Sequence, residues 1–222
     1  MTANRETLLE QAPNLVRAMV EKVEQAQAVE LAALPADRTA LIIVDMINGF
    51  AREGALASPR VGGLIPTITD LLQRAKERGI AAVAFGDSHL EDSLEFQSYP
   101  PHCIAGTAES EVVAELAGVG GYTFLPKNST NGFIEPGFQA WLAGHPTVDT
   151  FVVVGDCTDI CVLQFVLKLK TDFTRQNRPV RIIVPVNGVE TFDAPGHPGD
   201  LLHVAALNLM MGNGIDVVSR ID

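Results

Sequence analysis

Residues 150–175 read TFVVVGDCTDICVLQFVLKLKTDFTR, and this stretch decides the fold of the chain. Its beginning is rich in β-branched residues and closes on a glycine, which is typical of a buried strand. After Cys161 the apolar residues recur at helical spacing, which predicts an amphipathic helix. We expect Cys161 to open this helix, with Thr158 and Asp159 as candidate N-cap residues. The positive end of the helix dipole then favours a thiolate at Cys161, as nucleophilic chemistry requires.

The same alternation of short apolar runs and helical stretches continues through the rest of the chain. Because the runs are too apolar for sheets with one wet face, we predict buried parallel strands. The alternation predicts a three-layer α/β domain. The expected strands are 40–45, 81–86, 122–126, 150–155, 180–186 and 215–219, and the expected helices are 64–78, 110–116, 136–142, 161–175 and 199–211.

The segment before the first strand has a different character. Residues 6–34 carry apolar residues at helical spacing, and Pro13 is expected to split or start a helix there. We predict a helical extension at residues 1–36, which serves packing or self-association, and one domain at residues 37–222. No internal repeat or low-complexity tract marks a further domain.

The composition of the chain argues against nucleic acids and membranes as binding partners. The chain has 222 residues and a formal net charge of -11, without the clustered Lys and Arg that nucleic acids and anionic membranes attract. No apolar stretch is long enough to span a membrane, and the N-terminus MTANRETLLEQ lacks the pattern of a signal peptide. Three cysteines do not make a disulfide framework. We therefore expect a cytoplasmic protein with neither nucleic acid nor membrane as partner.

Polar residues follow four of the expected strands, where open parallel sheets bind their ligands. Asp45 follows the first strand, Asp87 and His89 the second, Lys127 the third and Cys161 the fourth. Each residue type alone is common at a strand end as a cap or a surface residue. Together, a carboxylate, an ammonium and a thiol supply the base, charge stabiliser and nucleophile for acyl transfer through a covalent intermediate.

A second cluster lies in GDSHLEDSLEFQSYPPHCIAGT, residues 86–107. Two imidazoles and one or two carboxylates suit a divalent transition metal, with water or substrate completing the shell. The pattern is equally compatible with a capped turn and a loop histidine bonded to the backbone. The candidate ligands are Asp87, His89, His102 and Glu95.

The order of these motifs resembles the nicotinamidase branch of the isochorismatase-like cysteine hydrolases. The PPHCxxGT block with Asp-x-His is specific to the metal-containing amidases, whereas the Asp, Lys and Cys triad is shared across the superfamily. The resemblance implies a Rossmann-like α/β/α fold with a six-stranded parallel sheet. In chain order the motifs are Asp45, Asp87-x-His89, PPHCIAGT at residues 100–107, Lys127 and CTDICV around Cys161.

The resemblance also implies a role for each residue of the triad. Cys161 is the nucleophile, Asp45 the proton acceptor and donor, and Lys127 the electrostatic partner. The backbone amides of Cys157 and Cys161 are placed to form an oxyanion hole. Relatives have a cis peptide in this loop, which corresponds to the bond between Asp156 and Cys157.

The substrate-binding and metal residues follow in the same way. Phe50 and Tyr99 are positioned like the aromatic residues that sandwich nicotinamide in similar enzymes. Ile47 and Ile160 depart from the pattern, because many relatives carry Gln at the first position and some carry His at the second. The implied metal ligands are Asp87, His89 and His102, with Glu95 where some relatives have a fourth.

These features predict a metal-dependent cysteine amidohydrolase, a nicotinamidase that makes nicotinate and ammonia through a Cys161 thioester in NAD salvage. One divalent ion, Zn, Mn or Fe, is expected as an anchor for the pyridine nitrogen. The expected partners are a small amide substrate and further copies of the chain. Two alternatives stay open: a related hydrolase acting on another small amide or on isochorismate, and a noncatalytic ligand-binding domain with the same fold.

Cys103, His197 and His203 receive no reactive role. Cys103 is expected to be a small buried side chain. The gap between Cys157 and Cys161 departs from thioredoxin-like motifs, which argues against a thiol oxidoreductase. His203 is expected to be surface or structural, and His197 to lie in a loop.

Overall fold

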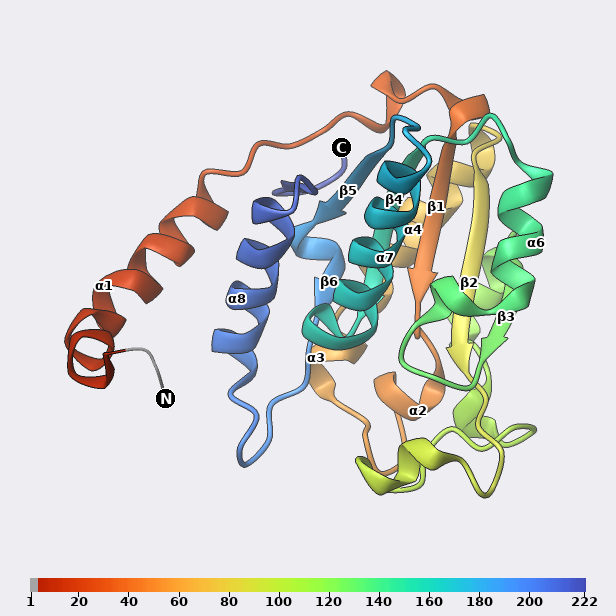
Figure 1. Ribbon diagram of the computed structural model, residues 1–222. Coiled ribbons are helices and arrows are strands. Elements are labelled where there is room, and N and C mark those ends of the chain that lie inside the picture. The colour runs from red at the N-terminus through yellow and green to blue at the C-terminus, as the bar shows by residue number, and fades with distance from the viewer. Residues whose placement is uncertain (1–3) are drawn as a thin grey trace.

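A parallel sheet with helices on both faces forms the body of the molecule, as the sequence predicts. The computed structural model describes residues 4–222 (Figure 1). The strands are β1 Thr39–Val44, β2 Ala81–Asp87, β3 Thr123–Lys127, β4 Thr150–Asp156, β5 Arg181–Pro185, β6 Val189–Glu190 and β7 Asp216–Val218. The helices are α1 Arg5–Glu24, α2 Asn48–Ala51, α3 Pro59–Gly62, α4 Ile65–Glu77, α5 Ala114–Val119, α6 Pro136–Gly144, α7 Leu163–Arg175 and α8 Gly199–Gly212.

The strand order locates the functional end of the sheet. The order is β3-β2-β1-β4-β5-β7, and every pair is parallel. All six expected strands are present, and β6 adds a seventh by pairing with β4. At two residues, β6 is too short to show a hydrophobic period. The chain winds outward from β1 in one direction and from β4 in the other, so a crevice opens between the carboxyl ends of these two strands.

The central strands are buried on both faces. In β1, Leu41 and Ile43 face one hydrophobic cluster, while Ile42 and Val44 face another. Helices α4 and α5 cover the first face, and α6, α7 and α8 cover the second (Figure 1). Each fully buried aliphatic side chain contributes about 1.5–3 kcal/mol, so the ends of β1 and β4 are firmly held.

The N-terminal helix α1 lies outside these layers, against α8 (Figure 1). The expectation that Pro13 splits or starts a helix is wrong, because α1 is continuous with Pro13 in its interior. Proline removes one hydrogen bond to the preceding turn, and in a helix with no buried residue water can satisfy the freed carbonyl. Within residues 4–222, no helix has the length and apolar character needed to cross a bilayer.

The rest of the predicted extension packs into the body. Leu31 and Leu34 are buried in the core, and the amide of Leu31 donates to the carbonyl of Asp222 at 2.7 Å. The division of the chain at residue 36 stays a prediction, and its first three residues lie outside the described ones. The part that stands apart from the domain is α1.

Candidate active site

A close approach of β1 and β4 builds the crevice. Gly155 has φ +113°, and a Cβ at this position would lie 1.9 Å from the carbonyl oxygen of Val44. Only glycine allows the two strands to converge here. The next residues, Asp45 and Asp156, are both buried at the crevice, and Asp45 adopts the left-handed backbone with φ +57°. A non-glycine residue in that conformation is uncommon and marks a functional site.

Lys127, the last residue of β3, gathers the predicted catalytic residues. Its Nζ lies 2.9 Å from Oδ2 of Asp45 and 3.7 Å from Sγ of Cys161. It also donates to the carbonyl of Ser129 at 3.2 Å and forms an ion pair with Oδ1 of Asp87. The ammonium is therefore surrounded by three protein oxygens and the thiol.

The protonation states follow from burial and charge. Burial lowers the pKa of Lys127, but Asp45 and Asp87 more than reverse this, so the ammonium keeps its charge. Burial raises the pKa of Asp45 to about 6 against the opposing effect of Lys127. Burial likewise raises the pKa of the Cys161 thiol well above its ordinary value, although Lys127 lowers it. Burial thus opposes the thiolate that the start of the helix is expected to favour, which makes a proton acceptor beside Cys161 more important.

The turn that carries the nucleophile also differs from the expected helix start. Cys161 lies in a single turn of π-helix, Thr158–Val162, which leads into α7. No side chain caps this turn, so the assignment of Thr158 and Asp159 as N-caps is wrong.

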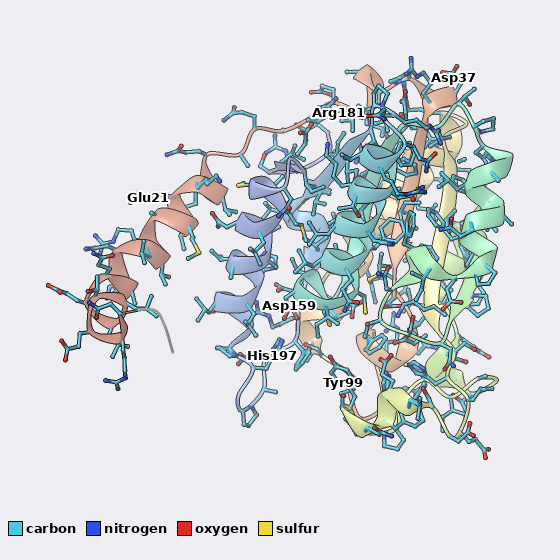
Figure 2. The ribbon with its side chains drawn as sticks, viewed as in Figure 1. Glu21, Asp37, Tyr99, Asp159, Arg181 and His197 are labelled. Carbon is cyan, nitrogen blue, oxygen red and sulfur yellow. The ribbon has the colours of Figure 1, made fainter. Side chains whose placement is uncertain are left out.

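These two side chains instead bind the segment that follows β6. Oγ1 of Thr158 lies 2.9 Å from Nδ1 of His203, which is the structural role expected for that histidine. Asp159 accepts from Oγ1 of Thr191 at 2.6 Å and lies 2.9 Å from Nε2 of His197. Figure 2 shows Asp159 and His197 at the same end of the molecule. The nucleophile turn is thus held by residues from the C-terminal part of the chain.

The backbone beside the nucleophile has the expected form. The peptide bond between Asp156 and Cys157 is cis. Cys157 and Cys161 both line the pocket, and Cys103, the third cysteine, is buried away from it. The oxyanion-hole role of the two amides stays a prediction.

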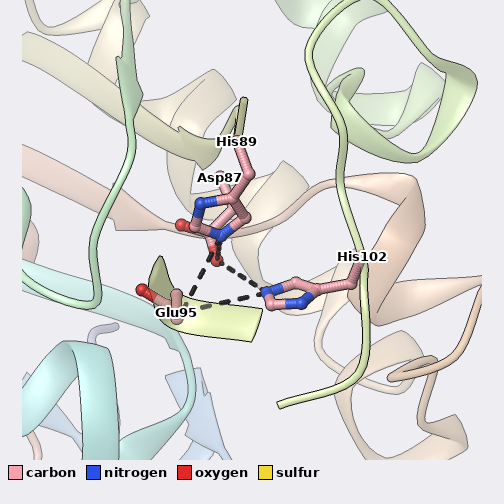
Figure 3. Close-up of side chains that lie close together, drawn as sticks. All are labelled: Asp87, His89, Glu95 and His102. Atoms are coloured by element: carbon pink, nitrogen blue, oxygen red, sulfur yellow. Dashed lines mark ion pairs between the residues drawn. The ribbon is translucent and has the colours of Figure 1, made fainter. Parts of the chain in front are cut away.

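The four predicted metal ligands converge on one point (Figure 3). Oδ2 of Asp87 lies 3.4 Å from Nε2 of His89 and 3.6 Å from Nε2 of His102. Oε1 of Glu95 lies 3.7 Å and 3.9 Å from the same two nitrogens. A tetrahedral shell with ligands at about 2.1 Å has edges of about 3.4 Å, so this cluster has the size of a divalent metal site.

Contacts behind the imidazoles aim them at that point. Nδ1 of His89 lies 3.0 Å from Oδ1 of Asn128, and Nδ1 of His102 lies 2.8 Å from the carbonyl of Pro100. Both partners are acceptors, so each ring donates from Nδ1 and presents Nε2 as the free ligand atom. Nε2 of His89 is buried without a hydrogen-bond partner. The residues present therefore fit a bound divalent ion.

One pocket joins the two clusters. Phe50 and Tyr99 stand beside His102, with ring centroids 5.6 Å and 6.3 Å from the imidazole. The wall also contains residues that the sequence did not assign to the site. Of these, only Asp156 could have been recognised from the sequence, because it is a carboxylate at the end of an apolar strand. The lining residues are Asp45, Phe50, Leu56, Asp87, Glu95, Tyr99, His102, Thr130, Asp156, Cys157, Ile160, Cys161 and Phe192.

A buried Asp, Lys and Cys group beside a metal-type cluster, at the switch point of a parallel sheet, defines the class of α/β cysteine hydrolases. The Isochorismatase domain model matches residues 39–221, and the chain belongs to the isochorismatase family. The predicted resemblance is thereby confirmed.

Similar proteins narrow the branch within the family. Nicotinamidase 1 of Arabidopsis thaliana is 33% identical over 213 residues, covering 82% of this chain and 85% of the relative. The structure of nicotinamidase from Bacillus subtilis is similar with a TM-score of 0.70 and 27% identity, covering 82% of this chain and 99% of that one. The pyrazinamidase of Pyrococcus horikoshii, solved in complex with zinc, has a TM-score of 0.66 and 25% identity, covering 82% and 98%.

Proposed function

We propose that this protein is a metal-dependent amidohydrolase that converts nicotinamide and water to nicotinate and ammonia. The observation that carries the proposal is the single pocket in which Asp87 contacts both Lys127 and the two imidazoles. The proposed nucleophile and three of the four candidate metal ligands thus line one pocket. The similarity to nicotinamidases supports the choice of substrate.

Acylation begins with the Cys161 thiol. Asp45 accepts its proton while sulfur attacks the carboxamide carbon, and Lys127 stabilises the charge that moves between them. The carbonyl oxygen becomes an oxyanion, to which the amides of Cys157 and Cys161 donate; such donors contribute about 3–4 kcal/mol each. Asp45 then returns the proton to nitrogen as the C–N bond breaks, which releases ammonia and leaves a thioester.

Deacylation uses the same base. Asp45 accepts a proton from water as its oxygen attacks the thioester carbon, and the C–S bond breaks to release nicotinate and the Cys161 thiol. The sum is one amide and one water converted to one acid and one ammonia. One general base therefore serves both halves of the reaction.

Asp87, His89, His102 and Glu95 would hold one divalent ion, Zn, Mn or Fe. When bound, this ion supplies a Lewis-acidic centre to which a pyridine nitrogen coordinates. Phe50 and Tyr99 then contact the faces of the ring, which restricts how the carboxamide meets Cys161.

An ammonia-release assay tests this function. The purified protein is given nicotinamide, pyrazinamide and a simple aliphatic amide, before and after removal of metal by a chelator. Turnover of the two ring amides that falls with the metal and returns on its addition is the expected result. Turnover of nicotinamide that is indifferent to the metal would overturn the ring-anchor role.

A second candidate is a related hydrolase of another small amide or of isochorismate. Ile160 lines the pocket at a position where some relatives carry His, which makes this wall more apolar. The same assay separates the candidates, because isochorismate hydrolysis releases no ammonia.

We also infer that the protein self-associates through α1 and works in the cytoplasm. Leu8, Leu9 and Leu15 of α1 are exposed, and no residue of this helix is buried. The three cysteines are free, which suits a reducing compartment.

A further inference from the structure

Asp156 is a buried carboxyl in the pocket to which neither the triad nor the metal cluster assigns a role. It is the last residue of β4, is 1% exposed and lines the pocket together with Asp45 and Cys161. Oδ2 has one weak partner, Sγ of Cys157 at 3.6 Å. Oδ1 has none. A buried acceptor is costly to leave without a hydrogen bond, so Oδ1 is an acceptor awaiting a donor.

The buried acceptor atoms without a hydrogen-bond partner match the two N–H donors of a primary carboxamide. Within residues 4–222, the buried side-chain atoms without a hydrogen-bond partner belong to Asp45, Thr69, His89 and Asp156. Thr69 lies on α4 and does not line the pocket, and His89 faces the metal cluster. Two carboxyl oxygens without a partner are left beside Cys161, namely Oδ1 of Asp45 and Oδ1 of Asp156, since Oδ2 of Asp45 lies 2.9 Å from Nζ of Lys127. A primary carboxamide brings two N–H donors to the same place.

The charges around Asp156 separate its role from that of Asp45. Lys127 pairs with Asp45 and Asp87, and no ion pair is found for Asp156 among the described residues. Burial raises the pKa of Asp156 well above its ordinary value, and the nearby Asp45 adds to the effect. This direction disfavours the ionised form that a second base for the thiol would need. Its carbonyl oxygen still accepts a hydrogen bond.

We propose that Asp156 accepts a hydrogen bond from one N–H of the bound carboxamide while Asp45 faces the other, so that Asp156 selects primary amides over acyl compounds without N–H groups. This inference rests on the proposed amide hydrolysis. In that complex the amide oxygen faces the backbone amides of Cys157 and Cys161, and every polar atom of the reacting group has a partner. Asp156 is a positioning residue that determines specificity, because it neither attacks nor carries the proton.

The test compares two variants of similar size. Asp156→Leu removes the acceptor, whereas Asp156→Asn keeps a carbonyl oxygen in its place. For each, kcat/KM is measured on nicotinamide and on methyl nicotinate, which share the ring and the acyl group but differ in N–H donors. Asp156→Leu is expected to lower the amide-to-ester ratio by about 10- to 100-fold, since an amide N–H is left buried without a partner. Asp156→Asn is expected to keep the ratio near that of the unaltered protein.

A second measurement replaces the ester as the reference compound if the ester is hydrolysed too slowly to measure. Pyridine-3-carbaldehyde adds to the same thiol and has no N–H, so its inhibition constant serves as the reference for amide KM and kcat/KM. A parallel loss of amide turnover and aldehyde binding in Asp156→Leu would overturn the inference. An amide-to-ester ratio that is unchanged in Asp156→Leu would also overturn it, as would a loss in Asp156→Asn equal to that in Asp156→Leu. Absence of amide hydrolysis by the unaltered protein would instead refute the proposed function itself.

Discussion

Asp45 and Asp87 both form ion pairs with Lys127, and the surroundings of the two carboxylates differ in chemistry. Both carboxylates are buried and both pair with the same ammonium. Burial raises the pKa of Asp45 to about 6. Burial acts on Asp87 in the same direction, but Lys127 and the imidazoles of His102 and His89 together hold its pKa well below its usual range. One carboxylate can therefore exchange a proton near neutral pH while the other stays a permanent anion.

Under the proposed function, one lysine supports two tasks. A base for the thiol must titrate near the working pH, whereas a metal ligand must stay ionised. The neighbours of each carboxylate differ: Asp87 lies beside the ammonium and the Nε2 atoms of two imidazoles, whereas Asp45 lies beside the ammonium and the Cys161 thiol. We therefore call Asp45 with Cys161 the base side, and Asp87 with the histidines the metal side.

Removal of the nucleophile should break the base side alone. Cys161→Ala is expected to lower kcat for nicotinamide on the order of 10⁴-fold or more, because no other side chain can form the thioester. Metal content, measured by elemental analysis, should stay at the level of the unaltered protein, since Cys161 is not among the clustered ligand atoms. Loss of metal together with activity would show that the two sides are not separable.

A change behind His89 should weaken the metal side alone. Asn128→Leu removes the acceptor for Nδ1 of His89, and we expect metal affinity to fall about 10- to 100-fold in a chelator competition. Asn128→Asp keeps an oxygen there and is the matched control. The rate of Cys161 alkylation should not change in either variant; a change would mean that the metal side controls the thiol.

The pH dependence should report on the base side. Asp45 must be ionised to accept the thiol proton, so kcat/KM should fall as the pH drops through about 6, by about tenfold for each further unit. Metal content should be measured over the same range, because against the effect of burial Asp87 raises the pKa of His89, whose protonation competes with metal binding. An acid limb that coincides with metal loss would assign the titration to the ligands.

Deletion of α1 should have the smallest effect on either side of Lys127. A chain that begins at residue 26 retains Leu31 and Leu34 in the core, and its kcat/KM and acid limb should match those of the full chain. Its mass by light scattering should drop to that of a monomer. A full-length chain that is already monomeric would refute the role of α1 in self-association.

Much of the fold follows from local patterns. The apolar runs that became β1, β2 and β4 predicted a buried parallel sheet, and the winding of the chain then brings Asp45, Lys127 and Cys161 to one edge. The continuity of α1 through Pro13 was not predictable in the same way, because the cost of proline depends on whether its neighbours are solvated.

The site was predictable as a set of residues but not as a set of protonation states. The thiol state of Cys161 depends on complete burial, which is a tertiary property that no motif encodes. The place of Asp156 and Phe192 in the pocket is likewise a tertiary property. Asp156 reaches the pocket at the end of β4, and Phe192 reaches it from the loop after β6, which pairs with β4. Spacing predicted the cluster of Asp87, His89, Glu95 and His102 because a metal site requires particular residue types close together.

The contacts of Asp159 bear on how this enzyme can be altered. Asp159 holds Thr191 and His197, and the ring of His197 stacks on Phe192 of the pocket wall with centroids 3.8 Å apart. Replacement of Asp159 by a residue without a carboxylate would leave these side chains without their partner. The turn and the loop after β6 therefore form one exchangeable unit, and libraries that alter substrate preference should vary both segments together.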